Sequence, residues 1–158
     1  MKSSRGLTLI EVLVALAIAG MLIGGIASLT ALSVRVSASS SASMQALFLA
    51  REVVEAVRSV RDETPWADGI GALVVGGTYY PSLSQDPPAW EFLAGEEEIE
   101  RFTRSFTMGG VFRDANNNIA STGTEDPNTR RLMVRVSWQE RSEEREEVLV
   151  TYITNWRE

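Results

Sequence analysis

The chain contains no cysteine and no histidine among its 158 residues. Without cysteine it has no disulfide, no thiolate metal ligand and no cysteine nucleophile. Without histidine it lacks the commonest general base and the commonest transition-metal ligand of proteins. These absences exclude most hydrolase constellations, and the sequence shows no phosphate-binding loop, nucleophile elbow or catalytic carboxylate pair. We therefore expect a protein that is not an enzyme.

Basic residues are also scarce, with 15 Lys and Arg against 21 Asp and Glu and a net charge of -6. Binding to a phosphate backbone needs clustered Lys and Arg side chains that release counterions. We do not expect nucleic acid as a partner unless the fold gathers scattered arginines into one exposed stripe. The arginines concerned are Arg101, Arg104, Arg113, Arg130, Arg131 and Arg135.

The most conspicuous stretch of the chain is an apolar run near its start, uncharged from Val12 to Val34. A helix of about 20 apolar residues spans a membrane, so this run is long enough to do so. Lys2 and Arg5 precede it, and positive charge holds that end in the cytoplasm, which places the rest of the chain outside. Glu11 lies inside the apolar block, where a carboxylate costs about 3 kcal/mol and suggests a function. The simpler alternative is that its side chain reaches back to the nearby interface.

Three interpretations of this segment compete. A secretory signal would be cut beyond the apolar run, and Ala38 offers a loose site for that cut. An uncut membrane anchor gives Glu11 no function. A cut before the run, after Gly6, would leave the apolar helix on the mature protein.

The residues at that junction resemble the processing and methylation motif of type IV prepilins and type II secretion pseudopilins. The resemblance covers Gly6 and the segment Leu7-Thr8-Leu9-Ile10-Glu11-Val12-Leu13-Val14-Ala15-Leu16. It implies that a prepilin peptidase cuts after Gly6, that Leu7 becomes the methylated first residue, and that Glu11 is needed for assembly. Phe is commoner than Leu at the first mature position in that family, and other apolar residues occur there.

A physical reason supports this arrangement. No amine exists at Leu7 while the bond to Gly6 is intact, and cutting that bond creates a positive terminus at the membrane edge. Glu11 of a neighbouring subunit can pair with this terminus, and such a partner sets the register between subunits. The implied partners are other pilin or pseudopilin subunits, prepilin peptidase, the membrane platform of the assembly machine and, before assembly, the lipids of the cytoplasmic membrane.

The apolar helix is expected to continue far beyond the membrane. Gly20 and Gly24 have the small-xxx-small spacing that permits close contact between helices. The Ser/Ala tract 37–43 could be a flexible linker by composition, but apolar residues resume at helical spacing after it. We predict one helix from Thr8 to Asp62, about 80 Å long, whose second half must cover its apolar face with other parts of the chain.

The C-terminal half has the alternation of β-strands. Leu132 to Trp138 and Val148 to Thr154 alternate strictly around a charged turn, 139–147, and predict a hairpin that covers the helix. Trp156, which follows, is expected to be a core or edge aromatic. Arg101 to Met108 predicts a further strand with Phe102, Phe106 and Met108 on one face. We expect a loop over 66–88 containing a short strand at 72–75, another short strand at 90–93, and a solvated turn at Glu96-Glu97-Glu98.

One loop has the oxygen spacing of a calcium site. Asp114, Asn116 and Asn118 stand at i, i+2 and i+4, and Asp126 follows in the same stretch. Asn/Asp runs between strands more often form turns, and no bidentate Glu stands at the expected distance. Some pseudopilins hold Ca²⁺ in such a loop, so the resemblance allows calcium as a cofactor; otherwise we expect none.

We therefore expect an α+β, pilin-like fold, in which the second half of a long N-terminal helix packs on an antiparallel sheet of about four strands. The expected parts are a leader (1–6), a membrane and assembly segment (7–34), an amphipathic half-helix (35–62) and a β-rich head (63–158). The protein would wait as a single-pass protein of the cytoplasmic membrane, with its head outside, and then enter a filament. The missing Cys pair and the acidic head favour a minor pilin or pseudopilin. The alternative is a membrane-tethered extracytoplasmic binding domain that does not polymerise.

Overall fold

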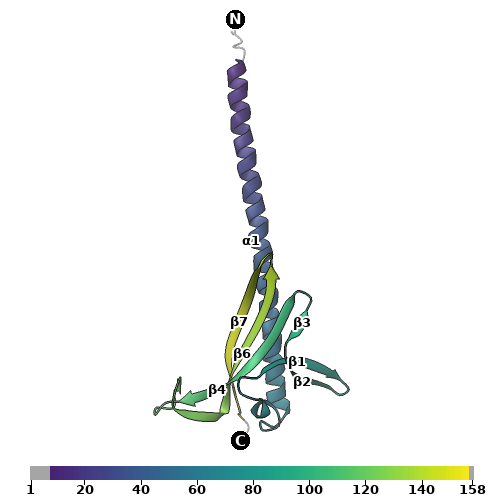
Figure 1. The fold of residues 1–158 in the computed structure, drawn as a ribbon, viewed down its shortest axis with the longest axis vertical. Coiled ribbons are helices and arrows are strands. Elements are labelled where there is room, and N and C mark those ends of the chain that lie inside the picture. Colours follow the sequence, from purple (N-terminus) through teal and green to yellow (C-terminus); the bar gives the residue numbers. More distant parts are fainter. Residues whose placement is uncertain (1–7, 157–158) are drawn as a thin grey trace. The chain divides into compact units, whose positions relative to one another are not determined.

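The computed structural model describes residues 8–156, in which one long helix precedes an antiparallel sheet (Figure 1). The chain divides into two compact units between Ser41 and Ala42. The helix α1 (Leu9–Glu63) is followed by a 3₁₀ turn at Ile70–Ala72. The strands are β1 (Thr78–Gln85), β2 (Pro88–Ala94), β3 (Glu97–Ile99), β4 (Phe102–Arg113), β5 (Ile119–Ala120), β6 (Thr124–Glu140) and β7 (Glu143–Thr154). The α+β, pilin-like class predicted from the sequence is confirmed.

Helix α1 is continuous over 55 residues, which confirms the single predicted helix. The tract 37–43 is helical, because serine and alanine are tolerated in a helix that apolar residues continue on both sides. The helix ends at Glu63, two residues before Pro65, because a proline disfavours helical geometry in the residue that precedes it.

The sheet has the order β2-β1-β4-β6-β7, and β3 and β5 pair with β4 outside this path. All of its pairings are antiparallel, and the predicted hairpin is formed by β6 and β7, with Val134 opposite Leu149. The turn itself is shorter than predicted, because the charged residues Glu143–Glu147 already belong to β7. Arg135 on β6 lies 3.3 Å from Glu146 on β7, so these charges form cross-strand pairs.

Several strand predictions were wrong. The sheet has seven strands rather than four, the segment 72–75 is not a strand, and the expected turn at Glu96-Glu97-Glu98 includes most of β3. Strand β1 was missed because Pro81 and the surrounding glycines indicate a loop. Only Thr78 and Tyr79 of β1 pair with β4, so one side of the strand is free at Pro81 and needs no N–H there.

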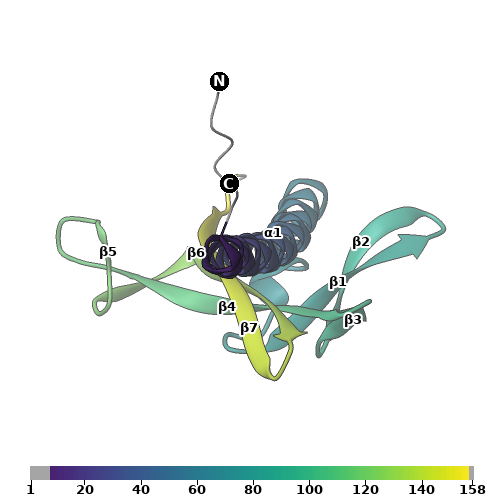
Figure 2. The same cartoon turned by 90° about the horizontal axis from the view of Figure 1, so that it is seen from above.

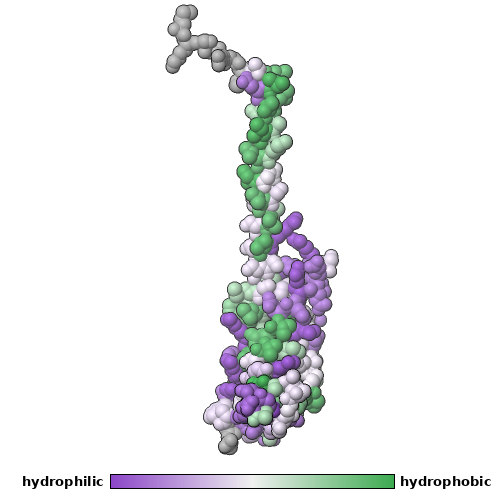
Figure 3. Space-filling model, turned by 90° about the vertical axis from the view of Figure 1, so that its left-hand side faces the viewer, coloured by the Kyte–Doolittle hydropathy of each residue, from purple (hydrophilic) through white to green (hydrophobic). Residues whose placement is uncertain are grey.

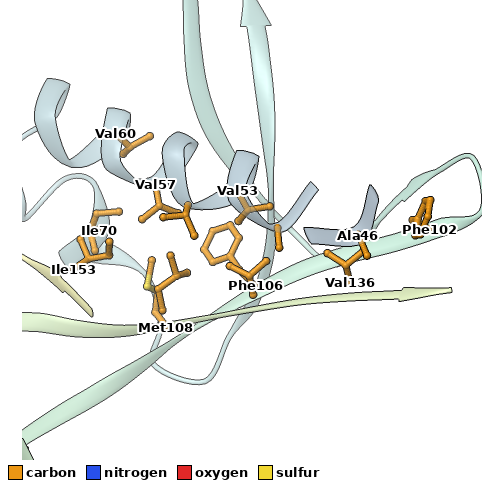
Figure 4. Close-up of a cluster of buried hydrophobic side chains, with 14 of the residues drawn as sticks. Ala46, Val53, Val57, Val60, Ile70, Phe102, Phe106, Met108, Val136 and Ile153 are labelled. Atoms are coloured by element: carbon orange, nitrogen blue, oxygen red, sulfur yellow. The ribbon is translucent and has the colours of Figure 1, made fainter. Parts of the chain in front are cut away.

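The core of the second unit lies between residues 42–63 of α1 and the inner face of the sheet (Figure 4). Ala46 and Ala50 are fully buried, and their small side chains let the helix approach the strands closely. Val53 and Val57 continue the same buried face. The sheet contributes Phe102, Phe106, Met108, Leu132, Val134, Val136, Trp138 and Ile153. Each large side chain in this layer stabilises the head by about 1.5–3 kcal/mol relative to exposure.

One charged side chain lies in this apolar layer. Arg104 shares the inner face of β4 with the predicted core residues and is 4% exposed. Its Nε donates to Glu97 Oε2 on β3 at 2.6 Å, and its Nη1 lies 3.2 Å from Glu52 Oε1 on α1. The Nη1 contact lacks the alignment of a hydrogen bond. The buried guanidinium therefore joins the helix to two strands through partners that are themselves partly exposed.

Candidate functional site

The first helical turn of α1 contains Glu11, the charged residue predicted to act in assembly. Thr8 precedes the helix, and Glu11 lies in its first turn. The Thr8 backbone N–H and its hydroxyl both donate to Glu11 Oε2, each at 2.9 Å, and the Glu11 N–H lies 3.4 Å from Thr8 Oγ1. This reciprocal arrangement is a capping box, which satisfies donors that the helix start leaves without partners. Gly6 and Leu7, the predicted cleavage and methylation residues, lie outside the described residues.

The capping box gives Glu11 a hydrogen-bond partner that was not expected from the sequence. The signal of the box in the sequence is the spacing Thr8-x-x-Glu11. The carboxylate has a local partner in the isolated subunit, so a buried and wholly unpaired charge is not required before assembly. Oε2 receives both hydrogen bonds, and no described residue donates to Oε1. The carboxylate can therefore take a further cationic partner without first leaving the cap.

The apolar part of α1 provides a surface of membrane-spanning length. Figure 3 shows hydrophobic residues along it, and this part contains a window long and apolar enough to cross a membrane, none of it buried inside the chain. Two of its hydroxyl groups are satisfied locally, since Ser28 and Thr30 donate to the carbonyls of Gly24 and Ile26 at 2.9 Å. A Cβ added at Gly20 or Gly24 would meet nothing within 4 Å. The room at these glycines is therefore available to a neighbouring molecule.

The loop predicted as a calcium site is closed by its own hydrogen bonds. Asp114 Oδ1 accepts the backbone N–H groups of Asn116 and Asn118 at 2.8 Å. Donation from Asn118, joined by Asn116, lowers the pKa of Asp114. Asp126 is held by Arg113 Nε at 2.7 Å. Partial burial alone would raise the pKa of Asp126. Hydrogen bonds from Arg113, Thr129 and Asn128 outweigh that effect and lower the pKa.

This geometry favours the turn over a cation site. Within residues 8–156, no group of three or more acidic side chains is placed to hold a metal ion. Arg113 also places a cation beside Asp126, which a calcium ion would have to displace. Calcium binding at Asp114, Asn116, Asn118 and Asp126 stays an untested prediction.

Three of the six arginines of the candidate stripe are held in ion pairs. Arg104 is buried and paired with Glu97, Arg113 is paired with Asp126, and Arg135 is paired with Glu146. Trp156 is 60% exposed and donates its Nε1–H to Asp62 Oδ1 at 3.1 Å, so it lies at the surface rather than in the core.

Residues 1–27 match the model of a protein family described as the prokaryotic N-terminal methylation motif. No curated protein and no solved structure matches the chain significantly. The match covers the basic lead, Glu11 and both spaced glycines, and it ends well before the head.

Proposed function

We propose, from the premise that residues 1–27 carry the methylation motif that marks type IV pilin and pseudopilin precursors, that this chain is a structural subunit of an extracytoplasmic filament. The single observation that carries the proposal is that motif, continued by a helix that extends far past the length of a membrane. The subunit is cut after Gly6, methylated at Leu7 and assembled through α1. It is a minor pilin or pseudopilin of a type IV pilus or a type II secretion filament, and it has no catalytic activity.

The capping box gives this proposal a physical sequence of events. Before processing, Thr8 holds Glu11 Oε2, so the carboxylate enters the membrane with a partner. Processing creates a positive terminus at Leu7, and the terminus of a neighbouring subunit approaches the Oε1 that no described residue occupies. Opposite charges attract strongly where water is excluded, and a pairing at one position along the helix fixes the axial register of the two subunits.

The N-terminal motif, the apolar helix and the basic residues before it also support a location in the membrane. The motif and the apolar helix fit a single-pass membrane-anchored protein. Lys2 and Arg5 keep its N-terminus in the cytoplasm, where prepilin peptidase and the membrane platform of the assembly machine meet it. The head, residues 63–158, lies outside, and after assembly the apolar part of α1 exchanges lipid for the helices of other subunits.

Two substitutions at Glu11 separate the assembly role from the local cap. Gln at this position keeps a side-chain oxygen for the capping box but has no charge, whereas Val removes both. If Glu11 pairs with the new terminus, Glu11→Gln and Glu11→Val both insert into the membrane and both fail to enter filaments. The readout is the amount of the chain in sheared filaments relative to its amount in membranes.

Two other outcomes would contradict parts of this proposal. Normal filaments from Glu11→Gln would show that Glu11 acts through the cap alone. A wild-type chain that stays in the membrane, in a host that assembles such filaments, would contradict the filament proposal as a whole.

A further inference from the structure

The segment that contains β1, β2 and β3 is acidic, because no Lys or Arg occurs from residue 62 to residue 100. The β1–β2 hairpin (Thr78–Ala94), here called the acidic arm, projects from the rest of the sheet (Figure 2). Glu91 and Leu93 of β2 point to the same face, about 7 Å apart. Both side chains are exposed, Leu93 by 42%, and Glu91 has no ion pair within the described residues.

A cavity of about 600 Å³ lies at the end of the sheet formed by β4, β5, β6 and β7, and Figure 2 shows β5 on the side opposite the acidic arm. Gly109 and Gly110 leave its floor without side chains. Its walls include Phe112, Ile119 and Tyr152, all three of which remain exposed. We call this cavity the glycine-floored pocket.

The glycine-floored pocket contains one charged residue, Arg131. Arg131 lies on β6 between Gly109 of β4 and Tyr152 of β7, its partners in register. No carboxylate in residues 8–156 forms an ion pair with it. The pocket therefore offers apolar walls beside an unpaired cation, and its volume lies in the range of clefts that bind ligands, roughly 300–1,000 Å³.

We propose that the acidic arm of one copy of this chain docks in the glycine-floored pocket of a second copy. Leu93 enters between the apolar walls, and Glu91 pairs with Arg131 of the neighbouring copy. A large exposed apolar side chain next to an unpaired carboxylate matches an apolar pocket next to an unpaired arginine.

The occupant is a second copy because the two surfaces are different, complementary and on opposite sides of one head. A contact between unlike surfaces leaves one arm and one pocket unused in every pair, so further copies can be added. It forms an open polymer when the rotation between copies does not close a ring, which is the case in a filament. This inference rests on the proposed function and adds to it a contact between heads, separate from the contacts of α1.

Cysteine cross-linking tests the contact in filaments, and the absence of natural cysteine removes background disulfides. In the full-length chain, Leu93→Cys combined with Ile119→Cys places one thiol on the arm and one in the pocket wall. Oxidation of filaments should give a ladder of covalent dimers, trimers and higher multimers. A matched control joins Ile119→Cys to Glu98→Cys, an exposed position on β3, and should leave monomers.

Charge reversal provides a second, independent readout. Glu91→Arg or Arg131→Glu alone places like charges together and should lower the assembled fraction by about tenfold or more, and the double reversal should restore it. Both residues are exposed, so the unfolding temperature of each variant should stay close to that of the wild type.

The outcomes separate this inference from the proposed function. Abundant filaments without the ladder, or with an equal ladder in the control pair, would overturn the head contact and leave the filament role intact. Cross-linking to one copy of a different protein would also overturn it, because the second copy would not be the occupant. Failure of the wild-type chain to enter filaments would contradict both proposals.

Discussion

In the buried cluster around Arg104, replacing the carboxylate partner Glu97 should destabilise the head more than replacing Arg104 itself. The Arg104 side chain is 5% exposed, whereas those of Glu97 and Glu52 are 31% and 48% exposed. Breaking a fully buried ion pair costs about 3–5 kcal/mol, because the remaining charge stays unpaired away from water. Glu97→Gln leaves Arg104 with the misaligned Glu52 contact, so we expect a loss of about 2 kcal/mol, below the range for full burial.

The other two substitutions should cost less. In Arg104→Met, both carboxylates are exposed enough to regain water, and the methionine side chain can pack in the apolar layer, so we expect a change within about 1 kcal/mol. Glu52→Gln removes a half-exposed carboxylate that makes no aligned hydrogen bond to Arg104, and Glu97 still pairs with the buried arginine, so it should cost about 0.5 kcal/mol.

Thermal unfolding followed by tryptophan fluorescence in mild detergent measures the relative stabilities of the three variants directly. Trp66, Trp90, Trp138 and Trp156 all lie in the unit that starts at Ala42, so the signal reports unfolding of the head. For a domain of this size, about 2 kcal/mol corresponds to a decrease of roughly 8 °C in the unfolding temperature. A greater decrease for Arg104→Met than for Glu97→Gln would refute the reasoning, as would an unchanged Glu97→Gln.

Three further predictions concern the helix and the Asp114 loop. Gly24→Leu should insert normally, because nothing lies within 4 Å of a Cβ there, but should reduce filament yield if a neighbouring helix packs at that position; wild-type yield would remove the packing role. The pKa of Asp114 is lowered from its ordinary value of 3.8, so its contribution is full above that pH and is lost as the pH falls through the lower folded value. The difference in unfolding temperature between wild type and Asp114→Ala should accordingly be constant from about pH 5 to 7 and shrink below 3.8. Calcium should leave the unfolding temperature unchanged; a specific site at a hundred times its Kd would add about 2.7 kcal/mol, and such a rise would establish the site.

The long helix and the β6–β7 hairpin could be predicted because each has a clear period. Apolar residues resume at helical spacing after the serine tract and form the buried face at Ala46 and Val53, and strict alternation identifies Leu132 and its neighbours as inward-facing. Strand β1 could not be predicted, because Pro81 is compatible with a strand only where one side is unpaired, and that pairing is a property of the whole sheet.

The partners of the charged core residue could not be predicted from the sequence. Alternation along β4 places Arg104 on the inner face, but the sequence does not reveal that Glu97 and Glu52 arrive beside it from other elements. The capping box of Thr8 and Glu11 was not predicted either, although it lies within four residues and has a recognisable spacing that local sequence would have revealed. The pocket at Gly109 and Gly110 depends on four strands meeting and had no signal in the sequence.

The central claim, that the Gly6–Leu7 bond is cut to produce the charge with which Glu11 pairs, is tested most directly at the N-terminus. Mass spectrometry of the protein from a host that contains prepilin peptidase should find a chain that begins at N-methyl-Leu7 and retains the entire apolar helix. An intact chain that begins at Met1, or a chain cut near Ala38, would contradict the account.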